Sequence, residues 1–180
     1  MSAPMTWDVV ESILPNGNFK VLDVGAGEQL NINHIWEFSG YDVHRCDLTD
    51  FPGVPKFTRC DLNRTFPYGD NEFDLCIAVE MIEHMENPRH FLRELKRISK
   101  GPIILTTPNL VTDASKAKFT SSGLFSFFEP KPGDCYGHIT PIFIWQIDQI
   151  CKELNLRKAV ETYNMDSKKE VIIWKLEQGV

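Results

Sequence analysis

The sequence predicts an α/β fold built on a mostly parallel sheet. Short apolar strands alternate with helical segments along a chain of 180 residues, which is the order typical of such sheets. Several of these strands are followed by glycine or acidic residues, and α/β sheets bind their ligands at the carboxyl ends of the strands. The length suits one domain, and we expect residues 1–180 to form it.

The first strand ends in a glycine turn. Residues 19–27 read Phe-Lys-Val-Leu-Asp-Val-Gly-Ala-Gly, a short apolar run of the kind buried on both faces of a sheet, followed by two glycines. Gly25 and Gly27 can adopt positive φ and let a ligand lie against bare backbone. This pattern indicates a nucleotide-like ligand.

The charge of this turn discriminates among nucleotides. Asp23 and Glu28 flank the glycines, Leu30 stands where a third glycine would be, and the chain has no Gly-Lys-Ser/Thr. Carboxylates would repel a phosphate bound at the turn. S-adenosylmethionine carries adenosine, a sulfonium and an ammonium group but no phosphate, so the turn favours it. A nicotinamide-dependent oxidoreductase remains the alternative, because it shares the strand and the turn.

The other elements follow from apolar periodicity and turn residues. The predicted helices cover residues 5–14, 30–36 and 88–99, and a long helix is capped by Thr140 with Pro141 at its first position. The further strands are a second one that ends at Asp42, followed by residues 57–60, 73–79, 102–107, 157–163 and 170–176. The last two strands should form a hairpin-like pair.

Two acids are expected to follow strands. Asp42 stands 17 positions beyond Gly25, and at the tip of the second strand its carboxylate would accept hydrogen bonds from both ribose hydroxyls. Asp61 follows the third strand and could reach the adenine amino group, with Leu62 packed on the ring. For both acids the alternative is a turn or capping aspartate.

The segment after the fourth strand contains metal-ligand types. Glu80, Glu83 and His84 are spaced i, i+3 and i+4, which would put them on one side of a helical turn, and His138 could add a fourth ligand. A helix start with acids at its favourable end is the alternative. His84 and His138 are also candidates for a general base, because imidazole titrates near neutral pH. A structural or surface histidine is the alternative for each.

The connection over residues 110–137 is about 28 residues long, where a few residues would suffice. Its second half carries large apolar side chains at Leu124, Phe125, Phe127, Phe128 and Tyr136. Because the segment leaves the carboxyl end of a strand, we expect a substrate lid inserted at about 110–138. A satellite core under a long loop is the alternative.

Charge and cysteine usage restrict the partners and the compartment. The formal net charge of −6 disfavours broad binding to nucleic acid or to an anionic membrane. The five cysteines are odd in number and include no Cys-x-x-Cys pair, as expected of reduced thiols. No signal pattern or run of 18 apolar residues is present, so we expect a cytoplasmic chain without a membrane span.

Six motifs in order resemble the class I S-adenosylmethionine-dependent methyltransferases. They are Val-Leu-Asp-Val-Gly-Ala-Gly at 21–27, Asp42, Cys-Asp-Leu at 60–62, Phe-Asp-Leu at 73–75, Glu-Met-Ile-Glu-His at 80–84 and Leu-Thr-Thr-Pro-Asn at 105–109. The last two are most similar to the ubiquinone-biosynthesis-like and sugar-modifying group. The resemblance spans residues 19–176 and implies a Rossmann-like three-layer sandwich, with a seven-stranded, mostly parallel sheet whose last strand is antiparallel.

The resemblance also implies a cofactor site. The residues carried over for binding S-adenosylmethionine are Asp23, Gly25, Ala26 and Gly27 at the methionine part, Asp42 at the ribose, Asp61 and Leu62 at the adenine, and Glu80 at the edge. The family often has a third glycine where this chain has Gln29. Glutamate-glutamate-histidine sets bind a divalent ion in some relatives, so a metal at Glu80, Glu83, His84 and His138 stays a secondary expectation.

The expected activity is methyl transfer to a small polar metabolite, by O-methylation of a sugar or a similar hydroxyl. Catalysis would consist of in-line placement, with His84 or His138 taking the proton. A metal-dependent RNA 2′-O-methyltransferase is one alternative. A non-catalytic cofactor-binding or partner subunit is another, and the oligomeric state stays open.

Overall fold

The structure, a computed structural model, describes residues 4–27, 40–130, 137–164 and 170–179. Its sheet has seven strands in the order β3-β2-β1-β4-β5-β7-β6. The strands are β1 Lys20–Val24, β2 Asp42–Asp47, β3 Phe57–Arg59, β4 Leu75–Ala78, β5 Ile103–Pro108, β6 Leu156–Tyr163 and β7 Val171–Gln178. β7 runs antiparallel to β5 and β6, and the other pairs are parallel. The predicted fold class is confirmed.

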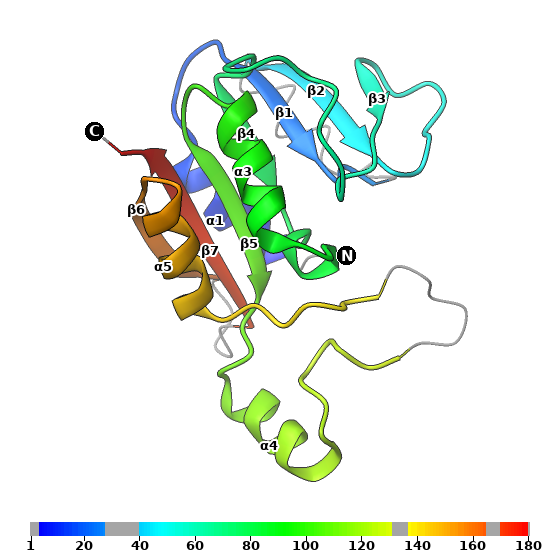
Figure 1. Cartoon of the computed structure of the whole chain (residues 1–180), viewed down its shortest axis with the longest axis vertical. Helices are drawn as coiled ribbons and strands as arrows, with labels where there is room; N and C mark the ends of the chain where they lie inside the picture. The colour runs from blue at the N-terminus through cyan, green and yellow to red at the C-terminus, as the bar shows by residue number, and fades with distance from the viewer. Residues whose placement is uncertain (1–3, 28–39, 131–136, 165–169, 180) are drawn as a thin grey trace.

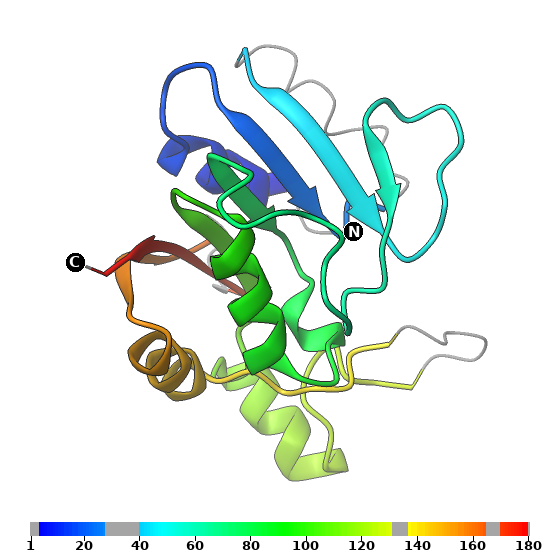
Figure 2. The same ribbon diagram turned by 45° about the horizontal axis from the view of Figure 1, so that its top comes forward.

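Helices cover both faces of the sheet (Figures 1 and 2). The helical elements of the described residues are α1 Pro4–Ile13, the 3-10 turn η1 Ile82–His84, α3 Pro88–Ile98, α4 Asp113–Ser122 and α5 Ile144–Glu153. α1 packs on one face, where Val10 joins Val21 and Ile77 in a core cluster. α3 and α5 pack on the other face, with Leu22 on the sheet side of that cluster. The alternation of Val21 and Leu22 between two cores gives three layers.

The central strands are apolar because both of their faces are covered. All four residues of β4 and all six of β5 are buried, as are the last four residues of β1. Strands of this kind read as continuous apolar runs in the sequence. They bring the carboxyl ends of β1, β4 and β5 to one edge of the sheet.

The long helix begins later than the sequence predicts. It starts at Ile144, whereas Thr140 was expected to cap it. The Thr140 hydroxyl donates to the Met85 carbonyl at 2.6 Å, and its N–H donates to the Glu83 carbonyl at 3.0 Å. Thr140 therefore ties the incoming segment to η1, and the helix begins three residues after Pro141.

Helix α4 lies inside the segment that was expected to be loop. Thr112 caps it by accepting a hydrogen bond from the Ser115 N–H at 3.1 Å, and Gly123 ends it with φ 73°. Ser115 is its one buried residue among those described, so the sequence has no apolar stripe that would reveal a helix. Figure 1 shows α4 beyond the end of β5, away from the sheet. The helical turns predicted over 30–36 lie outside the described residues.

A partly buried ion pair between Arg97 and Glu94 fastens the loop before β4 to α3. Arg97 donates to both carboxylate oxygens of Glu94, at 2.7 and 3.0 Å, and to the Tyr68 carbonyl at 2.8 Å. Glu94 also accepts from the Phe66 N–H at 2.9 Å. The hydrogen bonds from Arg97 hold the pKa of the Glu94 carboxyl below its ordinary value. The pair therefore stabilises the fold while Glu94 is ionised.

Replacing Arg97 by alanine should lower the free energy of unfolding at neutral pH by roughly 2 to 3 kcal/mol, because Glu94 keeps a buried charge without its partner. The difference from wild type should shrink as the pH falls below the ordinary pKa of a glutamate, and should be smallest below the lowered pKa of folded Glu94, where the carboxyl is protonated in both states. Urea unfolding of Arg97→Ala measures this. Arg93→Ala, at an exposed position of the same helix, is the control; an equal loss in both variants would contradict the assignment.

Candidate functional site

The glycine turn follows β1 and folds back against the end of β2. Gly25 and Gly27 adopt positive φ of 73° and 59°. The Gly25 and Ala26 N–H groups both donate to the Cys46 carbonyl, at 2.8 and 3.2 Å. The Gly27 N–H donates to Asp47 Oδ2 at 2.9 Å. A carboxylate of β2 is thus fixed directly beside the turn. Glu28, Gln29 and Leu30 lie outside the described residues.

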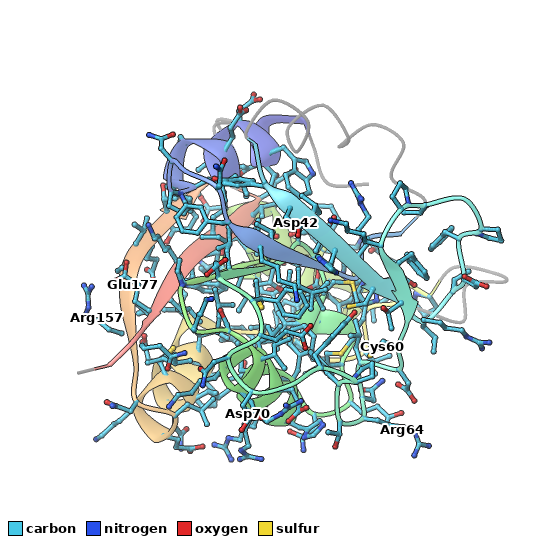
Figure 3. The ribbon with its side chains drawn as sticks, turned by 90° about the horizontal axis from the view of Figure 1, so that it is seen from above. Asp42, Cys60, Arg64, Asp70, Arg157 and Glu177 are labelled. Carbon is cyan, nitrogen blue, oxygen red and sulfur yellow. The ribbon has the colours of Figure 1, made fainter. Side chains whose placement is uncertain are left out.

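The predicted position of Asp42 is wrong. Asp42 is the first residue of β2 and pairs in register with Lys20, the first residue of β1. It therefore lies at the amino edge, roughly 16 Å along the strand from the glycine turn, and forms an ion pair with Lys56. Figure 3 labels Asp42 near the start of β2 and Cys60 just beyond the end of β3.

Asp47 takes the place that was expected for Asp42. It ends β2, and its Oδ1 accepts a hydrogen bond from the Thr49 N–H at 3.0 Å. The strand was missed because only Val43 and Cys46 are buried in it, so its pattern is irregular. The sequence does contain a signal, since Cys-Asp-Leu occurs at 46–48 and again at 60–62. In both copies a buried cysteine precedes an aspartate at the carboxyl edge.

Asp61 and Leu62 follow β3 at that same edge. Asp61 accepts hydrogen bonds from the Asn63 N–H and from Arg64 Nε, both at 3.0 Å. Leu62 is buried in the core cluster that includes Cys60 and Phe66. Asp61 thus has a turn role, and Leu62 forms part of the core beneath this edge.

Asp23 is the most deeply buried of the predicted cofactor residues that ionise. It lies in β1 opposite Arg45 of β2, and only 5% of it is exposed. Burial raises its pKa to about 7, against the attraction of Arg45, and the charge of Asp47 raises it further. Near neutral pH this carboxyl is thus partly protonated.

Glu80 follows β4 in a strained conformation. Its φ is 54°, a left-handed value that costs roughly 1 to 2 kcal/mol for a residue with a side chain. Thr106 of β5 accepts from the Glu80 N–H and donates its hydroxyl to Glu80 Oε1, both at 3.0 Å. Burial raises the pKa of Glu80 to about 7.

Glu83, His84 and His138 come together although His138 lies in a distant segment. Glu83 is fully buried; its Oε2 accepts from the Thr107 hydroxyl at 3.0 Å, and its Oε1 lies 3.9 Å from His138 Nε2. The rings of His84 and His138 meet edge to face at 4.6 Å between centroids. One ligand atom from each of the three lies within 4.8 Å of the others, a group that does not include Glu80.

Burial and the nearby charge of Glu80 raise the pKa of Glu83 well above its ordinary value. The Glu83 carbonyl also accepts the N–H groups of Ile139 and Thr140, both at 3.0 Å. These bonds hold His138 beside η1. The predicted proximity of Glu83, His84 and His138 is therefore present. Thr106 and Thr107, which were noted only as part of a motif, each bind one of the two buried acids.

A family model and several solved structures are similar to this chain. Residues 22–102 match the family model described as a methyltransferase domain, a segment that includes the glycine turn and η1 but not His138. No curated protein sequence matches the chain.

Solved structures cover nearly the whole chain. An S-adenosylmethionine-dependent methyltransferase from Mesorhizobium loti is 13% identical with a TM-score of 0.70, covering 98% of this chain and 99% of its own. One from Aquifex aeolicus is 15% identical with a TM-score of 0.64, covering 95% and 88%. The cyclase SpnF is 14% identical with a TM-score of 0.69, covering 96% and 79%. At these identities the shared property is the fold.

The fold and the strand order are those of the class I S-adenosylmethionine-dependent methyltransferases. Residues 22–102 also match the methyltransferase-domain model, and this match together with the fold supports an S-adenosylmethionine-dependent methyltransferase. Among the described helices, none is long and apolar enough to cross a membrane. The four cysteines in the described part of the chain are free thiols.

The buried carboxyl of Asp23 should make stability depend on pH. Its pKa is about 7 in the folded protein against an ordinary 3.8, so the folded state binds more protons between these values, and stability falls as the pH rises through that window. Asp23→Asn should remove this fall, gaining up to roughly 4 kcal/mol relative to wild type between pH 4 and pH 8. Chemical unfolding across this range measures it.

The control for this experiment is Asp8→Asn, at an exposed position on α1, which should leave the pH profile of wild type unchanged. A profile of Asp23→Asn parallel to that of wild type would show that Asp23 is ionised throughout, and would contradict the buried neutral carboxyl.

Proposed function

We propose that the chain transfers the methyl group of S-adenosylmethionine to a hydroxyl group of a small polar metabolite, such as a sugar. The observation that carries this proposal is the contact of Glu83 with His138. A hydroxyl acceptor needs a base, because its own pKa is high. With Nε2 at 3.9 Å from Glu83 Oε1, a proton taken up by His138 would favour the ionised form of Glu83, and the two opposite charges would then stabilise each other. His84, in contact with the same ring, is the second candidate.

The cofactor would lie across the carboxyl ends of β1, β2 and β4. Asp23, Gly25, Ala26 and Gly27 would bind its methionine part, as the family pattern implies. We assign the ribose hydroxyls to Asp47 in place of Asp42. Two oxygens of a carboxylate offer about four acceptor sites, so Asp47 can bind ribose while it holds Gly27 and Thr49.

The remaining contacts are assigned by their place at the same edge. Asp61 would approach the adenine, with Leu62 in the core below it, and Glu80 would border the cofactor at the end of β4. The acidic surroundings of the turn, Asp23 and Asp47, support a ligand without phosphate. This weighs against the nicotinamide-dependent alternative.

The segment at about 110–138 would form a wall over the acceptor, within one domain of residues 1–180. Phe119 and Phe127 are 48% and 44% exposed, which leaves apolar surface that could meet a substrate. Phe128 lies 5.2 Å from the His138 ring and Phe125 lies 5.6 Å from Phe143, between centroids. The two contacts support a satellite core that anchors the wall. Tyr136 lies outside the described residues.

Two imidazoles and a carboxylate are also a ligand set that divalent ions accept. If an ion binds, we propose that Glu83, His84 and His138 hold it, where it would polarise the acceptor hydroxyl, and that Glu80 does not. A bound ion would favour the RNA 2′-O-methyltransferase alternative, against which the net charge of −6 counts. A non-catalytic subunit is the remaining alternative; measured turnover of an acceptor would exclude it.

Calorimetry with S-adenosylhomocysteine tests the cofactor assignment. Asp47→Ala should weaken binding roughly ten- to a hundredfold, since a hydrogen bond to a charged group is worth about 1.5 to 3 kcal/mol. Asp42→Ala is the matched control, because it removes the same group from the other end of β2, and its affinity should stay within twofold. Weaker binding by Asp42→Ala than by Asp47→Ala would assign the ribose to Asp42. Tight binding of NAD in place of S-adenosylhomocysteine would contradict the assignment to this cofactor.

Elemental analysis of protein purified without chelator tests the metal. We expect less than stoichiometric metal and unchanged binding of S-adenosylhomocysteine after treatment with EDTA, because Glu83 and His138 already supply an acid–base pair. One ion per chain that is lost in His138→Ala and retained in Glu80→Gln would contradict the base assignment, and would identify the three residues as ligands.

A further inference from the structure

The side chain of Met81 covers the backbone of Gly25. A Cβ built on Gly25 would lie 2.2 Å from Met81 Sδ, 2.4 Å from Cγ and 2.6 Å from Cε. The whole end of the methionine side chain therefore packs on the bare face of the glycine turn. That face is open to contact only because residue 25 has no side chain.

The backbone around Met81 is fixed from both sides. Before it, Glu80 is held at φ 54° by its two hydrogen bonds with Thr106. After it, η1 begins at Ile82, which is fully buried. Met81 itself is only half-buried, although it contacts the large core cluster. The main chain is thus rigid, while the unbranched side chain keeps three rotatable bonds.

The same face of Gly25 is needed by the ligand. On the proposed function, the amino-acid part of S-adenosylmethionine lies against residues 25–27, at the carboxyl end of β1. The Met81 thioether and the cofactor cannot both occupy the space against Gly25. Since the backbone on either side of Met81 is fixed, rotation of its side chain is the motion that resolves the conflict.

We propose that Met81 gates the glycine turn, so that the cofactor enters only when this side chain rotates away from Gly25. Only the molecules in which Met81 is rotated can then bind the cofactor. Because they are a minor fraction, the association rate constant and the apparent affinity are both reduced by that fraction. Met81 is a gating residue and takes no part in the transfer itself. The inference rests on the proposed cofactor site.

Stopped-flow binding of S-adenosylhomocysteine to the full chain tests the gate. Met81→Ala should raise the association rate constant about three- to tenfold, as expected if the rotated form is a minor fraction, while the dissociation rate constant stays within twofold. Met81→Leu keeps the bulk over Gly25 and should resemble wild type. Met81→Ile should bind more slowly, because a β-branched side chain is stiff at χ1.

Met85→Ala is the matched control. Met85 lies at the other end of η1 and is buried, and the side-chain atoms that would meet a Gly25 Cβ belong to Met81. Loss of this methionine should lower the unfolding temperature and leave the association rate constant unchanged. An unchanged association rate in Met81→Ala, or faster dissociation from it, would overturn the gate, whereas absence of binding in wild type would instead refute the cofactor site.

Discussion

Three backbone N–H groups of one turn donate to the last two residues of a neighbouring strand, and the site depends on these bonds. Gly25 and Ala26 donate to the Cys46 carbonyl, and Gly27 donates to Asp47. The bonds require the positive φ of Gly25 and Gly27 and the parallel pairing of β1 with β2. Together they fix an acidic side chain beside the turn, where the proposed function puts the ribose of the cofactor.

Buried acids are the second constraint on this edge. Asp23, Glu80 and Glu83 all have raised pKa values because they are desolvated, and burying a charge is costly unless it is paired. Thr106 and Thr107 offset part of that cost by donating hydroxyl groups to Glu80 and Glu83. Buried acids with raised pKa values are common at sites that transfer protons or bind a cationic ligand.

The sequence predicts the strands correctly where helices cover both faces of the sheet, because such strands are continuous apolar runs. β1, β4 and β5 are buried on both faces, so their apolar runs can be recognised in the sequence. The motifs Glu-Met-Ile-Glu-His and Leu-Thr-Thr-Pro-Asn, which follow or include two of these strands, contain the buried acids and the threonines that bind them. The sequence misplaces Asp42 because β2 has few buried residues, so its pattern does not distinguish the start of the strand from its end. α4 was missed because a helix that packs on little has no apolar stripe. Met81 lay within a quoted motif, but its contact with Gly25 depends on the strained φ of Glu80, which a sequence pattern does not express.

We propose that the cofactor lies across the glycine turn, between Asp47 and Met81. A crystal structure of the protein with S-adenosylhomocysteine measures this most directly. We expect ribose hydroxyls within about 2.6 to 3.2 Å of the Asp47 carboxylate, the amino-acid part against Gly25, and Met81 turned away from it. A ligand whose ribose met Asp42 at the amino edge would contradict the assignment to Asp47, and one bound with Met81 still packed on Gly25 would contradict the gate.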